Sequence, residues 1–178
     1  MITLRELAAW EDRLDRLRRD AVAAQPPDAL DAHDRALEQR GIYAEYAAVF
    51  RSYVDTAELA DDESAALEAL KRATLLLWLA GVLPAPATGI AELPDQAVRT
   101  VRRRLEERAR HGTLDDELLW MLPWYHAVSD FALVGQEALP HLEALVVDAD
   151  AQGWRRRARR EALRERGWLG RYWLQQLG

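Results

Sequence analysis

A chain of 178 residues with 49% apolar and 30% charged side chains is long enough for one domain with a substantial core. This balance excludes a largely disordered chain, and the net charge of −6 argues against general binding to nucleic acid or to a membrane surface. The absence of cysteine excludes disulfides, thiol catalysis and thiolate metal sites.

Helix signals dominate the first sixty residues. Thr3 and Glu6 form a capping-box pattern that opens a helix of about twenty residues with one apolar stripe. Pro26 ends it, because proline disfavours helical geometry in the residue before it. Asp28 is expected to cap a second helix, and Gly41 either breaks that helix or weakens it.

Helix start and stop signals of the same kind continue to the end of the chain. Asp61–Ser64 opens a helix whose stretch Leu75–Ala80 is apolar on every side and should be the most deeply buried. A long loop is expected over 81–94. Asp95 is expected to cap a helix that stops at His111, and Asp150 to cap an Arg-rich helix that runs to about Arg166. Further helices are expected from Leu114 to about Leu133 with a kink or break at Pro123, from Pro140, and after Gly167.

These elements predict an all-α fold, a single-domain bundle of about seven to nine helices spanning residues 1–178. The longest apolar run, Leu75–Val82, is far shorter than the roughly 20 residues that a bilayer requires. The first twenty residues lack the apolar core of a signal peptide. We therefore expect a cytoplasmic protein without membrane contact.

Charge is distributed unevenly along the chain. Residues 1–90 carry sixteen acidic and ten basic side chains, and residues 111–154 carry no basic one, whereas eight arginines follow from Arg155 onward. The arginines could fold back and neutralise the acidic window. Alternatively, the window could stay open for a basic partner, whose encounter it would accelerate. A nucleic-acid patch is the least favoured reading, because the run Arg155–Arg160 points around more than one face of a helix.

Motifs for catalysis are missing. There is no Gly-x-Ser-x-Gly elbow and no phosphate-binding glycine loop. His126 and Asp130 share one helix face, but a di-metal site in a bundle needs Glu-x-x-His pairs on two helices, and the chain has none. We expect no catalytic residues, no metal site and no cofactor.

Seven tryptophans are many for this length. Two clusters, Trp120–Tyr125 and Trp168–Trp173, could either close the core or form an exposed interface, because Trp and Tyr dominate both settings.

One pattern of residues runs through much of the chain: Leu70-Lys71-Arg72, Trp78, Thr88-Gly89-Ile90, the stretch Leu114–Leu122 that reads LDDELLWML, Tyr125, Asp130 and the tail Arg166–Trp173. This pattern resembles that of a family of small, uncharacterised bacterial all-helical proteins. It implies a helical fold but assigns no activity. In size, charge and fold class such proteins are similar to bacterial immunity proteins, which neutralise toxins by binding them.

The sequence therefore favours a non-enzymatic protein-interaction module of the immunity or antitoxin kind. Its partner would be a basic toxin domain, and the expected contact residues are Asp115, Asp116, Glu117, Trp124 and His126. One alternative is a metal- or small-ligand-binding enzyme with a pocket formed by Thr88, Tyr125, His126 and Asp130. Another is a homodimeric scaffold that pairs through the tail 168–173.

Overall fold

The computed structural model describes residues 2–135, 137–147 and 149–178, and within these ranges it contains twelve helices and no strand. The all-α prediction is confirmed, and the helix count is higher than the expected seven to nine. The helices are α1 (Leu4–Ala23), α2 (Leu30–Gln39), α3 (Ile42–Leu59), α4 (Glu63–Val82), α5 (Ala85–Thr88), α6 (Asp95–His111), α7 (Leu118–Val128), α8 (Asp130–Val134), α9 (Pro140–Val147), α10 (Trp154–Arg157), α11 (Arg160–Leu163) and α12 (Gly167–Gln176).

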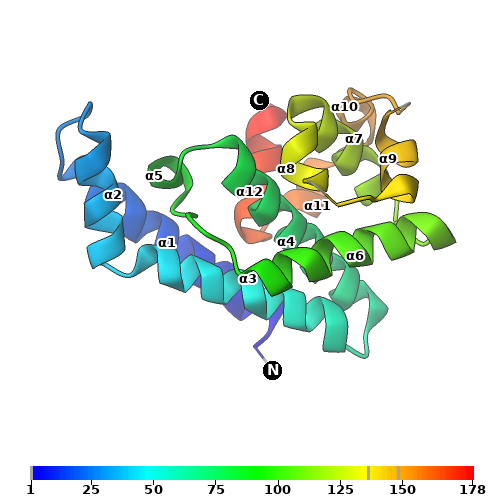
Figure 1. Cartoon of the computed structure of the whole chain (residues 1–178), viewed down its shortest axis with the longest axis horizontal. Coiled ribbons are helices and arrows are strands. Elements are labelled where there is room, and N and C mark those ends of the chain that lie inside the picture. The colour runs from blue at the N-terminus through cyan, green and yellow to red at the C-terminus, as the bar shows by residue number, and fades with distance from the viewer. Residues whose placement is uncertain (1, 136, 148) are drawn as a thin grey trace.

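Four long helices form the frame of the molecule. α3 packs along α4 and α1, and α6 packs on α3 and α4 (Figure 1). The short helices α7 to α11 gather at one end, whereas α2 and α5 lie at the other (Figure 1). α12 returns from the far end of the sequence to pack against α1 and α4. α12 thus connects α1 to the end of the bundle that holds the short helices α7 to α11.

Three helix boundaries follow the sequence signals. The Thr3 hydroxyl accepts a hydrogen bond from the Glu6 amide at 3.2 Å while the Glu6 carboxylate accepts one from the Thr3 amide at 2.8 Å, which is the expected capping box. Asp62 caps α4 by accepting from the Ser64 amide at 3.1 Å. Gly41 breaks the chain between α2 and α3, because its φ of 68° is left-handed.

Replacing Gly41 with alanine is expected to lower the free energy of unfolding by about 1 kcal/mol. A Cβ at this position would meet no atom within 4 Å, so the cost comes from the left-handed backbone alone. Gly41→Asn should cost less, because asparagine tolerates this conformation better than alanine does. Urea unfolding of the three proteins measures the difference, and an alanine variant as stable as the parent would contradict the expectation.

Three expected caps are wrong. The residue before α2 is Ala29 and not Asp28, and the residue before α6 is Pro94, so that Asp95 is the first helical residue. The Arg-rich segment enters its first helix, α10, at Trp154 after Gly153, so that Asp150 lies outside it. Asp95 still lies in the first turn of α6, where the helix dipole favours a negative charge.

Two of the extra helices arise where one expected helix is divided, and a third, α5, forms inside the segment 81–94 that was expected to be a loop. The segment 114–133 becomes α7 and α8, and the break falls at Ser129, whose hydroxyl accepts from the Ala132 amide, while Pro123 lies inside α7. The Arg-rich segment 151–166 becomes α10 and α11, because Trp154 and Leu163 are both 1% exposed. Nine residues apart, these two side chains would point to opposite faces of one continuous helix, so the break allows both to reach the core.

The core forms where the sequence placed it. All residues of Leu75–Leu79 are buried, and so are all residues of Trp120–Tyr125 except Trp124, which is half-buried. Trp173 is completely buried among Trp120, Trp154 and Tyr125, with ring centroids between 4.6 and 5.7 Å from it. The tail 168–173 therefore helps to close the core of its own chain.

Candidate functional site

A buried ionic cluster joins α4 to the segment before α7 and to the start of α12. The Lys71 ammonium lies 2.6 Å from both the Asp115 and the Glu117 carboxylates. The Arg166 guanidinium bonds Glu117 with two nitrogens at 2.8 Å. It also pairs with Glu68.

The cluster neutralises part of the acidic window. Burial alone would raise the pKa of the Glu117 carboxyl, but hydrogen bonds from Arg166 and Lys71 outweigh it and hold that pKa below its ordinary value. Glu68 is shared in the same way between Arg166 and Arg72, whose nitrogen lies 2.7 Å away. An arginine of the basic C-terminal segment thus folds back on an acid of the window, as the first alternative for the uneven charge expects.

The five expected contact residues do not form one open acidic face. Asp115 and Glu117 are engaged with Lys71 and Arg166, whereas Asp116 is exposed. Trp124 donates a hydrogen bond from Nε1 to the Tyr172 hydroxyl at 2.7 Å, and His126 is half-buried. Of the three acids, Asp116 alone is exposed and makes none of the ion pairs found among the described residues.

The four residues of the alternative pocket are not brought together. Thr88 is fully buried in α5, where its hydroxyl accepts from the Ile90 amide at 3.1 Å, and α5 packs on α1, α2 and α4. Tyr125 and His126 lie in α7, which packs on α8, α9 and α10, well away from α5 (Figure 1). Tyr125 is fully buried, its hydroxyl accepting from Trp173, and Asp130 is exposed.

A second buried acid lies beneath the start of α12. Glu11 is 1% exposed, and its carboxylate accepts a hydrogen bond from the Trp168 amide at 2.9 Å. Burial raises the pKa of the Glu11 carboxyl to about 7, although the Trp168 amide and the charges of Arg72 and Arg171 lower it. Gly167 is required above it, because a Cβ there would overlap the carboxylate.

The position of Glu11 in the sequence could have indicated that its side chain is buried. Leu7, Glu11 and Leu14 follow the spacing of four and three that marks the apolar stripe of the first helix, so the acid occupies a core position. An acid at such a position indicates a buried polar contact. The amide that bonds it, from Trp168, lies 157 residues further along the chain, so no local pattern predicts the contact.

An acidic groove of about 490 Å³ lies at the other end of the molecule, between α2, α3 and the linker after α5. Its walls carry three exposed carboxylates, from Asp34, Glu38 and Glu92, and the half-buried ring of Tyr43. Alanines form most of the remaining lining, and none of the described residues that line the groove is basic. The Tyr43 hydroxyl donates to Asp34 at 2.5 Å, which fixes one wall.

The carboxylates of the groove, unlike those of the ionic cluster, are open to a charged group from outside the chain. Asp34 and Glu38 are one turn apart on α2 and face solvent, so their field extends outward. A guanidinium or ammonium group entering the groove would meet carboxylates on two walls and an aromatic ring on one. The sequence shows the pair on α2, but only the fold brings Glu92 beside it.

Within the residues that the structure describes, no group of three or more His, Asp or Glu side chains is arranged to hold a metal ion. None of the described helices combines the length and apolarity needed to cross a membrane. Comparison of the chain with family models, curated proteins and solved structures finds no match. The resemblance to small bacterial helical proteins therefore stays a prediction.

Proposed function

We propose that the chain is a non-enzymatic interaction protein that binds a basic partner protein through the acidic groove of α2, α3 and the linker at Glu92. One observation carries this proposal. The groove presents three exposed carboxylates and Tyr43, with no cation among the described residues that line it. Such a surface favours a partner with arginine or lysine side chains and speeds its encounter.

The proposed contact surface lies away from the segment 115–117, where the sequence predicted it. Two of the three acids there, Asp115 and Glu117, already have cations of the same chain as partners, and a binding partner would have to compete with these partly buried ion pairs. By contrast, none of the described residues that line the acidic groove is a cation, so its three acids have no such partner there. A basic toxin domain in the cytoplasm, neutralised by this chain as an immunity protein would do, is the partner class that we infer.

The proposal predicts a specific pattern of variants. In co-expression with the products of neighbouring genes, the chain should form a stable complex with a basic protein. Reversing two groove charges, Glu38→Lys with Glu92→Lys, should slow association by roughly tenfold or more at low salt. Both side chains are exposed, so the fold should be retained.

Asp116→Lys is the matched control, since it reverses an exposed acid on the segment that the sequence favoured. Stopped-flow or surface-plasmon association rates at two salt concentrations separate the two surfaces. If Asp116→Lys slows binding and the groove variant does not, the partner docks at 115–117 and the groove assignment is wrong. If no neighbouring product co-purifies or is neutralised, the proposed function itself is overturned.

A further inference from the structure

A second groove, of about 320 Å³, lies between α7, α9 and α10 at the opposite end from the acidic groove. Its apolar surface comes from Leu119, Trp120 and Leu145, and Leu119 is 36% exposed. Arg156, Arg157 and Asp150 stand at its edge and are exposed, and Asp150 pairs with Arg156, so that Arg157 supplies the positive charge left without this partner. This groove therefore offers an apolar contact bordered by positive charge.

The positive charge extends beyond the groove itself. The segment 155–164 carries several exposed arginines but a single acidic residue, Glu161. Arg156 is held by Asp150 at 2.5 Å, and Arg155 lies over the Trp154 ring at 5.1 Å. A ligand with an apolar anchor and flanking carboxylates would satisfy both features of this surface.

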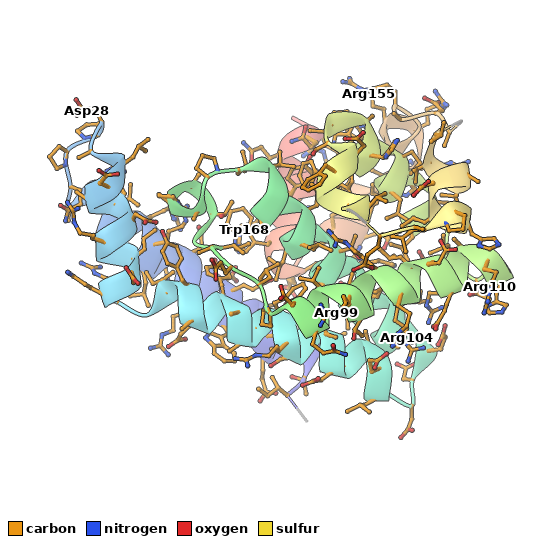
Figure 2. The ribbon with its side chains drawn as sticks, viewed as in Figure 1. Asp28, Arg99, Arg104, Arg110, Arg155 and Trp168 are labelled. Atoms are coloured by element: carbon orange, nitrogen blue, oxygen red, sulfur yellow. The ribbon has the colours of Figure 1, made fainter. Side chains whose placement is uncertain are left out.

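The chain carries an element of that chemistry on its own surface. Leu30, the first residue of α2, is 63% exposed, and Leu59, Phe131 and Val147 are exposed to a similar degree. Asp28 and Asp31 flank it, and both are exposed. Asp28 lies at the left extreme of the molecule and Arg155 at the top on the right-hand side (Figure 2), so this element does not reach the basic groove of its own chain.

We propose that the groove of α7, α9 and α10 receives the start of α2 from a second copy of this chain. Leu30 would contact the apolar floor, and Asp28 and Asp31 would face Arg157. The two contact surfaces lie at opposite ends of one molecule, so the contact is head-to-tail and leaves each end free to bind again. Association should give salt-sensitive chains of increasing length and no closed dimer.

Neither surface of this contact belongs to the lining of the acidic groove, so the inference stands apart from the proposed function. Purified protein at low salt should show a weight-average mass that rises continuously with concentration in sedimentation or light scattering. High salt should return it to the monomer mass. A monomer at all concentrations, or a dimer that does not grow, would overturn the proposal.

Two single variants and their mixture test the geometry. Asp31→Arg removes the acidic end and Arg157→Glu removes the basic end, and each alone should weaken self-association by roughly tenfold or more. Mixed together, they should form a one-to-one dimer that cannot grow, because each supplies the intact end that the other lacks. Circular dichroism checks that both are folded.

Two controls complete the experiment. Arg16→Glu changes an exposed arginine on α1 and should assemble like the parent. Glu38→Lys with Glu92→Lys should also assemble, although it should fail to bind a basic partner. Self-association that survives both end variants, or a mixture that stays monomeric, would contradict the head-to-tail contact.

Discussion

Arg166→Met is expected to lower the free energy of unfolding by about 3 kcal/mol at neutral pH. The guanidinium is 11% exposed and is shared between Glu68 and Glu117, which are 18% and 25% exposed. Its removal leaves two partly buried carboxylates with fewer cations, and burial of an unbalanced charge costs more than the ion pair contributes. The effect should lie at the low end for a buried pair, because both carboxylates retain some contact with water.

A second substitution tests the cause. Arg166→Met combined with Glu117→Gln should recover part of the lost stability, since it removes one of the unbalanced charges. Arg164→Met is the matched control two residues away, and its exposed side chain predicts a change within about 0.5 kcal/mol. Guanidinium unfolding curves compare all four proteins. Equal losses for Arg164→Met and Arg166→Met would show that the buried cluster does not stabilise the fold.

Glu11→Gln is expected to stabilise the protein at alkaline pH by up to about 3 kcal/mol and to have little effect below about pH 4.5. Burial raises the pKa of this carboxyl from 4.5 to about 7 in the folded protein. Between these values the folded state holds a proton that the unfolded state has released. The parent therefore loses stability as the pH rises from about 4.5 to about 7, and the loss is complete above that range.

The glutamine variant removes this slope because it has no proton to release. Its carbonyl can still accept the hydrogen bond from the Trp168 amide, so the packing of α12 on α1 is retained. Asp20→Asn is the control, an exposed acid on the same helix. Thermal unfolding between pH 4 and pH 9 measures the effect. A parallel pH dependence in the Glu11→Gln protein would mean that the carboxyl does not titrate in this range.

Local rules predicted most of the helix boundaries but not the way in which the chain closes. The capping box at Thr3, the cap at Asp62 and the break at Gly41 depend on neighbouring residues, and all three are present. The division of 151–166 depends on which side chains the core can accept. Trp154 and Leu163 both enter it, and no property of the segment alone determines that.

The candidate contact surfaces also depend on long-range packing that the sequence does not reveal. The acids of 115–117 look like an open patch in the sequence, and the fold supplies Lys71 and Arg166 to two of them. Conversely, Glu92 follows α5 in a segment expected to be a loop, and its position beside Asp34 and Glu38 depends on how α5 packs. Pairings between residues distant in sequence decide which charges are open to a partner.

Some of the segments that carry the resemblance contact one another. Lys71 and Arg72 lie in the ionic cluster with Glu117 and Arg166, and Trp78 donates to the Tyr125 carbonyl at 3.0 Å. Thr88 lies in α5, apart from these contacts, and Asp130 is exposed. Part of the pattern therefore consists of residues that pack in the core or pair in the ionic cluster.

The contact between Glu11 and Trp168 also constrains the order in which the molecule can be assembled. It joins residues 157 positions apart, so α1 must wait for almost the whole chain to be synthesised before this partner exists. Closing so large a loop carries an entropic cost that local helices do not share, which places the docking of α12 late in folding. Trp173 then supplies the ring that packs against Trp120 and Tyr125, so the docking of α12 also completes the aromatic part of the core.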